Sequence, residues 1–185
     1  MDKTLIEKIL YGGGVFFDLT KWILLTIIVL VLVGSFWYTV FLVDGISMEP
    51  NFLDGELVVL DKTFFRGDKI PQRGQPVVVR YPGDPDNKRY VKRVVGLPYE
   101  DVLIASGGVY IDGKLLDERY LPVYFETEPD GSWGLKDNEY FLMGDNRANS
   151  NDSRYFGVVE KRFFIGRAVA IIFPRLRFVE LPLYK

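Results

Sequence analysis

Three short polar segments of this 185-residue chain contain residues that could perform hydrolysis. Segment 44–50 places Ser47 in a short stretch between a glycine and a proline, where one residue could present its hydroxyl and its backbone N–H together. Segment 89–96 contains Lys92, and segment 144–154 has one alanine among polar residues and glycine. A serine hydroxyl can become a nucleophile when a neighbouring amine accepts its proton. Taken singly, the segments also fit a turn at a strand entrance, a charged edge, and either a solvated loop or a buried polar network.

The composition of the chain excludes most other hydrolytic mechanisms. The sequence contains neither histidine nor cysteine, so it cannot form a Ser-His-Asp triad or a Cys-His pair. A catalytic zinc site normally uses these same residues, and we expect no metal or other cofactor. The formal net charge of −2 does not indicate the basic surface that nucleic-acid binding requires. Carboxylate chemistry, or a serine or threonine activated by lysine, remains.

The position of Lys92 in its segment favours an unusual amine. Residues two apart on a strand point to the same face, so Tyr90, Lys92 and Val94 share one side. Burial of that side would lower the pKa of Lys92 below its reference value of about 10.4. A pKa of about 8 requires roughly 3 kcal/mol of differential burial, which is feasible for one buried amine. The alternative is a side chain that extends to solvent.

The stretch between Lys21 and Asp44 contains no charged residue and predicts a transmembrane helix. Its 22 residues would form a helix about 33 Å long, enough to cross a hydrocarbon core of about 30 Å. Trp22 and Trp37 lie near its two ends, where aromatic rings favour the membrane interface. The length argues against a buried core helix, and the missing A-x-A pattern argues against a cleaved signal peptide.

Charges on either side of this stretch predict its orientation. Three lysines precede it, whereas every charged residue between it and Lys62 is acidic. Cytoplasmic flanks carry the excess of basic residues. We therefore expect residues 1–21 to be a cytoplasmic tail, residues 22–43 to be a transmembrane signal anchor, and residues 44–185 to form one extracytoplasmic domain.

The rest of the chain has the pattern of a β domain. Short runs rich in Val, Ile, Tyr and Phe alternate with a period near two, which is typical of strands. Asp112-Gly113 between two such runs suits a type I′ hairpin turn. Residues 117–138 are aromatic and acidic, and we expect them to leave the sheet. The fold class is thus mostly β, with one N-terminal transmembrane helix followed by an all-β catalytic domain. The predicted strands are 56–62, 75–81, 88–97, 101–105, 109–116, 139–145 and 168–173.

Four motifs in a fixed order resemble the type I signal peptidases, also called leader peptidases or peptidase family S26. They are SMEP from Ser47, GELVVLDK at 55–62, YVKRVVGLP at 90–98 and GDNRANSNDSR at 144–154. The resemblance covers roughly residues 20–170. The short insertion between the last two motifs is similar to the compact form of the family, which has a single span and an all-β catalytic domain of the signal-peptidase type.

The resemblance implies a role for each matching position. Ser47 matches the nucleophile, and its backbone N–H matches an oxyanion donor. Lys92 matches the general base, and Ser150 matches a hydroxyl that orients the lysine amine. Asp145 and Arg93 match a supporting ion pair, and Asp152 and Arg154 match polar positions near the site. The walls of two shallow apolar pockets for small side chains match Phe41, Val43, Met48, Phe52, Tyr90 and Val91.

The same resemblance implies precursor proteins with signal peptides as partners, cut after an A-x-A-like end, and contact with membrane lipid. Some members carry a serine two positions before the nucleophile that helps to bind the oxyanion, and this chain has Gly45 there. A backbone amide, a water or nothing would replace that donor. Two alternatives stay open: a Ser/Lys peptidase dedicated to one specialised precursor, and an inactive membrane-anchored binding module on the same scaffold.

Overall fold

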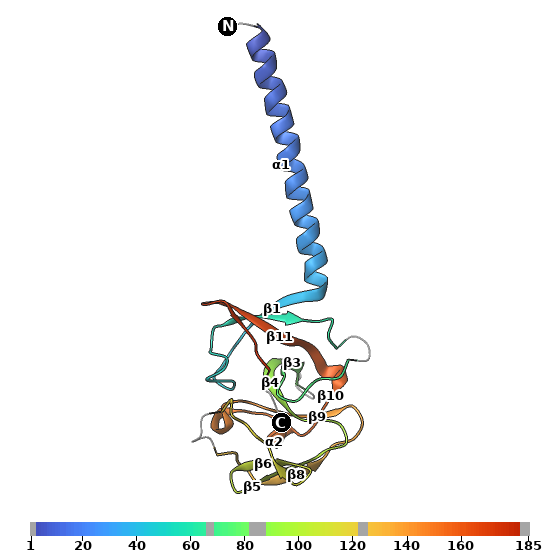
Figure 1. Ribbon diagram of the computed structural model, residues 1–185, viewed down its shortest axis with the longest axis vertical. Helices are drawn as coiled ribbons and strands as arrows, with labels where there is room; N and C mark the ends of the chain where they lie inside the picture. Colours follow the sequence, from blue (N-terminus) through green and yellow to red (C-terminus); the bar gives the residue numbers. More distant parts are fainter. Residues whose placement is uncertain (1–2, 66–68, 82–87, 122–125, 182–185) are drawn as a thin grey trace. The chain divides into compact units, whose positions relative to one another are not determined.

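The computed structural model describes residues 3–65, 69–81, 88–121 and 126–181 (Figure 1). It divides into two compact units, Met1–Trp37 and Tyr38–Lys185. The first unit consists of one helix and the second of β-sheets. The predicted fold class, an apolar N-terminal helix followed by a mostly β domain, is confirmed.

The N-terminal unit is the single helix α1 (Lys3–Trp37). Its part Phe16–Trp37 has 22 residues and a mean hydropathy of 2.3, so its length and composition suffice to cross a membrane. Thr26 and Ser35 donate their hydroxyl protons to backbone carbonyls one turn earlier, at 2.8 and 2.7 Å. These bonds satisfy polar groups within the helix itself, as a hydrocarbon environment requires.

The helix does not coincide with the expected span of residues 22–43. It ends at Trp37, and Tyr38–Leu42 forms strand β1, which pairs antiparallel with β2 (Leu57–Asp61). Residues 38–42 are β-branched, aromatic or leucine, and their backbone groups find partners on β2. The expected C-terminal limit at residue 43 is therefore corrected to Trp37. At the other end, the helix extends back through the expected tail to Lys3.

The second unit, here called the β domain, contains two antiparallel sheets. The larger sheet has the strand order β1-β2-β11-β3-β4-β9-β10, with β12 paired to β11, and the smaller has the order β7-β6-β5-β8. Figure 1 shows the smaller sheet at the end of the β domain away from β1. The further strands are β3 (Pro76–Arg80), β4 (Arg89–Gly96), β5 (Asp101–Ala105), β6 (Gly108–Ile111), β7 (Lys114–Leu115), β8 (Gly131–Gly134), β9 (Glu139–Met143), β10 (Val159–Glu160), β11 (Phe164–Phe173) and β12 (Arg177–Phe178).

Most strands follow the sequence pattern. All seven predicted runs contain strands, and the Asp112-Gly113 turn between β6 and β7 has the two positive φ angles, 48° and 76°, of a type I′ turn. Four strands, β1, β8, β10 and β12, were not predicted. The expectation that residues 117–138 leave the sheet is wrong for β8, which pairs with β5.

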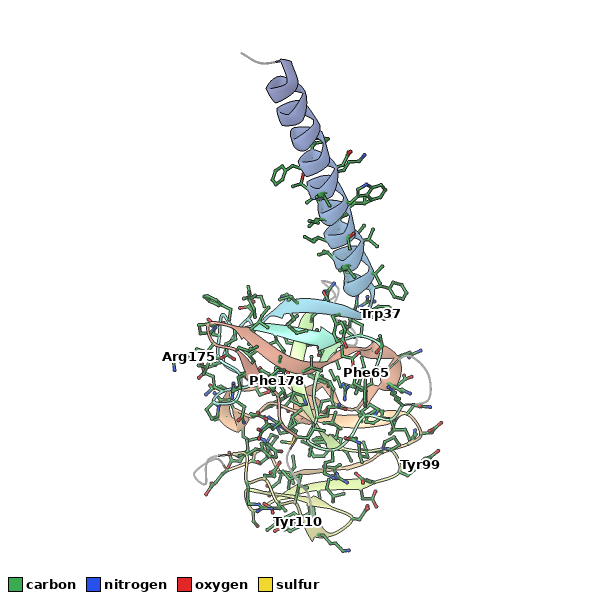
Figure 2. All side chains as sticks on the ribbon, turned by 45° about the horizontal axis from the view of Figure 1, so that its top comes forward. Trp37, Phe65, Tyr99, Tyr110, Arg175 and Phe178 are labelled. Carbon is green, nitrogen blue, oxygen red and sulfur yellow. The ribbon has the colours of Figure 1, made fainter. Side chains whose placement is uncertain are left out.

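Strand β4 lies at the centre of the β domain, because three apolar clusters meet on it. Val91 belongs to one cluster, Val94 to a second and Val95 to a third, and residues 91–96 are all buried. Side chains fill the interior of the domain, whereas Tyr99 and Phe178 lie at its surface, 76% and 74% exposed (Figure 2). Lys92 and Arg93 in the middle of β4 are therefore buried, whereas Arg89 at its start is exposed.

Candidate active site

The structure brings Ser47 and Lys92 together. Ser47 lies in the turn that follows β1, and Lys92 lies on β4, 45 residues later. The Lys92 Nζ atom is 2.7 Å from Ser47 Oγ, within hydrogen-bond distance. The lysine is 1% exposed, so of the two alternatives the buried position is observed. The half-buried ring of Tyr90 lies 5.8 Å from the amine, on the same side of the strand.

Burial controls the charge of Lys92. Loss of hydration lowers its pKa from 10.5 to about 8, and the positive charge of Arg154 acts in the same direction. The carboxylates of Asp152 and Asp145 oppose this shift without cancelling it. A lysine with this pKa has a substantial neutral fraction under mildly alkaline conditions. The neutral amine can accept the proton that the Ser47 hydroxyl donates.

The backbone around Ser47 leaves one N–H donor unused. The Ser47 carbonyl accepts a hydrogen bond from the Asn146 N–H at 3.1 Å, and the Ile46 carbonyl accepts one from Asn146 Nδ2 at 3.2 Å. Within the described part of the chain, the Ser47 N–H has no hydrogen-bond acceptor. A free N–H beside a nucleophile can bind the oxyanion that forms during acyl transfer.

Gly45 does not supply a second oxyanion donor from its backbone. Its N–H donates to Asp54 Oδ1 at 2.8 Å, so this proton is already used. The residue has a φ of +92°, where a side chain is strained, although a Cβ atom there would meet nothing within 4 Å. A serine at this position would thus have space for its side chain but an unfavourable backbone.

Segment 144–154, here called the catalytic loop, is mostly a buried polar network and not a solvated loop, although Ala148, Asn149 and Asn151 are exposed. Asp145 accepts hydrogen bonds from Arg93 at 2.7 and 2.5 Å, and both side chains are at least 96% buried. Asp152 accepts from Arg154 at 2.8 Å and from the Gly144 N–H at 2.9 Å. Burial alone would raise the pKa of Asp152, but Arg154 and Gly144 hold it below its ordinary value. The two predicted acidic residues and their arginines therefore form ion pairs.

Ser150 lies in this network without the predicted bond to Lys92. Its Oγ atom is buried and makes no hydrogen bond with a described residue. It is nevertheless close enough to the Asp152 carboxylate to contribute to the lowered pKa of that group. The role of Ser150 as the group that orients the lysine amine stays a prediction.

Gly144 allows the catalytic loop to lie directly against the turn that carries Ser47. A Cβ atom on Gly144 would be 2.4 Å from the Ser47 carbonyl oxygen and 2.2 Å from Ser150 Oγ. Atoms cannot approach so closely without displacement of one of the two segments. Glycine is therefore required here for a close approach between segments.

Five of the six predicted pocket residues gather in one apolar cluster. Val43, Met48, Phe52 and Val91 are between 1% and 5% exposed, and the partly buried Phe41 packs against them. The sixth residue, Tyr90, lies outside this cluster beside Lys92, with its ring 5.9 Å from that of Tyr81.

Sequence reasoning missed several residues around the site. Asn146 holds the Ser47 turn, and Asn51 donates to Asp145 at 2.9 Å. Tyr120 stacks its ring 4.3 Å from the Arg93 guanidinium, and Glu118 forms an ion pair with Arg147. The acidic and aromatic residues of segment 117–120 were the sequence feature that could have indicated these contacts.

The described residues hold no group of three or more acidic side chains placed to bind a metal ion.

Comparisons with known proteins agree over most of the chain. A profile of the family described as "Signal peptidase, peptidase S26" matches residues 16–173. Signal peptidase I of Bacillus amyloliquefaciens is 35% identical over 167 residues, which cover 85% of this chain and 88% of that protein. Signal peptidase I S of Bacillus subtilis strain 168 is 32% identical over 171 residues, which cover 83% of this chain and 87% of that protein. A crystal structure of a signal peptidase I from Enterococcus faecalis V583 aligns with a TM-score of 0.46 at 30% identity, over 54% of this chain and 97% of that one. From the family profile and the two relatives, the chain belongs to the signal peptidase family, peptidase S26.

Proposed function

We propose that Ser47 and Lys92 form the catalytic dyad with which this signal peptidase removes signal peptides from precursor proteins. The observation that carries the proposal is the 2.7 Å separation of Ser47 Oγ from an amine that is almost fully buried. The site also supplies the remaining requirement of acyl transfer, because the Ser47 N–H is available to an oxyanion. An intact dyad of this kind does not favour an inactive binding module.

The chemistry follows from the two protonation states of Lys92. The neutral amine accepts the Ser47 proton while Oγ attacks the scissile carbonyl carbon, and the Ser47 N–H binds the negative oxygen. The ammonium then donates its proton to the leaving amine, and an acyl-enzyme forms. Lys92 next accepts a proton from water, the hydroxide attacks the ester carbon, and Ser47 recovers its proton from the lysine. No cofactor is required for these steps.

The apolar cluster beside the dyad supports cleavage after small residues. Val43, Met48, Phe52 and Val91 are already packed to 5% exposure or less, so little of their apolar surface is open to a substrate side chain. Large side chains would require displacement of this packing, which is costly in a dense core. We infer that the residues at the first and third positions before the cut are small, as in an A-x-A end.

The distribution of charge supports one topology. Lys3 and Lys8 precede the apolar helix segment Phe16–Trp37, Lys21 lies near its start, and acidic residues follow it up to Lys62. We infer that this segment crosses the membrane among its lipids, with the N-terminus in the cytoplasm. The β domain then lies on the extracytoplasmic side, where translocated precursors emerge.

Cleavage of a signal-peptide precursor by the full-length protein in detergent tests the dyad. Ser47→Ala and Lys92→Ala should each abolish cleavage, whereas the exposed controls Ser132→Ala and Lys114→Ala should retain it. For the unsubstituted protein, kcat/KM should rise with pH through an apparent pKa of about 8, as Lys92 loses its proton. Cleavage by either dyad variant would contradict the assignment.

A further inference from the structure

The contacts of Glu118 and Thr127 with the catalytic loop reveal a route from Glu118 to the nucleophile. We propose that Glu118 is a positioning residue that acts through Arg147 to hold the turn of Ser47. The inference rests on the proposal that Ser47 is the nucleophile. It gives a function to an acidic and aromatic segment that the catalytic motifs do not include.

Arg147 is the first link in this route. It lies in the short helix η1 (Arg147–Asn149), and its side chain is only 1% exposed. Its Nη1 atom donates to Glu118 at 3.0 Å and to Thr127 Oγ1 at 2.6 Å, and its Nη2 atom donates to the other Glu118 oxygen. The Tyr120 hydroxyl donates to Glu118 at 2.8 Å. The carboxylate is thereby held on two sides, and it neutralises a buried cation.

The second link joins Arg147 to Ser47. The Arg147 Nε atom donates to the Gly144 carbonyl at 3.1 Å, and Gly144 lies directly against the Ser47 carbonyl. Asn146, between these two loop residues, donates its N–H to that same carbonyl at 3.1 Å. Any displacement of the Arg147 guanidinium is therefore transmitted to the backbone of the nucleophile.

The charge of Glu118 is what keeps Arg147 in this position. A buried guanidinium without its carboxylate is strongly unfavourable, so it moves toward solvent or binds another group. Either movement breaks the bond to the Gly144 carbonyl. A misplacement of about 1 Å at a catalytic group can lower a rate by about 100-fold. Glu118 has no contact with the apolar cluster of Val43 among the described interactions, so substrate binding should change little.

The neighbouring Asp117 provides a matched control. Asp117 pairs with Arg119 at 2.8 Å, but these side chains are 47% and 70% exposed. Asp117→Asn removes the same charge from the same segment as Glu118→Gln. In full-length protein, measured well below the unfolding temperature of every variant, Glu118→Gln should lower kcat by about 10- to 100-fold with KM nearly unchanged. Asp117→Asn should leave both constants at the level of the unsubstituted protein.

A double-mutant cycle tests whether Glu118 acts through Arg147. The double variant Glu118→Gln/Arg147→Gln should lose no more kcat than Arg147→Gln alone, because the two residues serve one contact. Independent, multiplicative losses would overturn the route. A Glu118→Gln variant that is less stable but has an unchanged kcat would show a purely structural role and also overturn it.

Two further variants keep these outcomes distinct. If Glu118→Gln does not fold, Glu118→Asp retains the charge on a shorter side chain, and its kcat should lie between the two extremes. A kcat of Glu118→Asp as low as that of Arg147→Gln would then count against a positioning role of the Glu118 charge. Ser47→Ala, assayed in parallel, separates the proposals: cleavage by that variant refutes the dyad, whereas an inactive Ser47→Ala with a fully active Glu118→Gln refutes only the positioning role.

Discussion

Replacing Lys92 with methionine tests whether burial keeps the amine of this proposed general base in its neutral form. Methionine has a similar length and no branch, so it can occupy the same space on β4 without a charge. The variant loses the base and should be inactive. Its stability is more informative, because a charged amine that is 1% exposed destabilises the folded protein.

The lowered pKa of Lys92 determines the size of the expected stability difference between the Lys92→Met and unsubstituted proteins. A fall from 10.5 to about 8 corresponds to about 3 kcal/mol, at about 1.4 kcal/mol for each pH unit. The lost hydrogen bond between residue 92 and Ser47 costs about 1 kcal/mol at every pH. At pH 7 the Lys92→Met protein should therefore be about 2 kcal/mol more stable than the unsubstituted protein.

The stability of the unsubstituted protein relative to Lys92→Met should increase with pH. Between about pH 8 and 10.5 the unfolded chain binds a proton at Lys92 that the folded protein does not bind. The stability contribution of Lys92 therefore rises with pH across this window. Above pH 10.5 the amine is neutral in both states, and the variant should become the less stable protein by about 1 kcal/mol.

Guanidinium unfolding of the full-length proteins in detergent, from pH 7 to 11, measures this difference. Trp133 reports on the β domain, because its ring packs 4.7 Å from that of Phe141. The exposed control Lys114→Met should show a constant difference from the unsubstituted protein over the same range. A Lys92→Met protein that is less stable at pH 7, or whose advantage does not decrease with pH, would refute the buried-amine reasoning.

Two substitutions in the catalytic loop give further predictions. Gly144→Ala places a Cβ atom 2.4 Å from the Ser47 carbonyl oxygen, so it should cost about 1–3 kcal/mol of stability and lower kcat at least about 10-fold, as thermal unfolding and peptide cleavage will show. Asp152→Asn leaves the buried Arg154 without its carboxylate and should destabilise the protein by about 3–5 kcal/mol in denaturant unfolding at pH 7. Because the pKa of Asp152 is lowered, this difference should be present above pH 3.8 and diminish on further acidification, and a constant difference would contradict the ion-pair explanation. The same substitution removes a carboxylate that raises the pKa of Lys92, so the alkaline rise of kcat/KM should move to lower pH.

The sequence by itself determined the available chemistry and most of the local structure. The absence of histidine and cysteine left lysine as the natural partner for a serine. The period of two predicted the main strands, and Asp112-Gly113 predicted its hairpin, because backbone propensity and turn geometry depend on adjacent residues. An uncharged stretch predicted the helix. The last residues of that stretch form β1 instead, because they pair with β2, and the local sequence pattern carries no information about that pairing.

Only the tertiary structure decided which polar residues are buried and what they contact. Lys92 loses its hydration because apolar clusters that include distant strands pack around β4. Its hydrogen-bond partner Ser47 is 45 residues away in the sequence. The route from Glu118 through Arg147 to the Ser47 turn likewise joins three separate segments. Desolvation and hydrogen bonding depend on these long-range neighbours, so local sequence patterns alone do not reveal them.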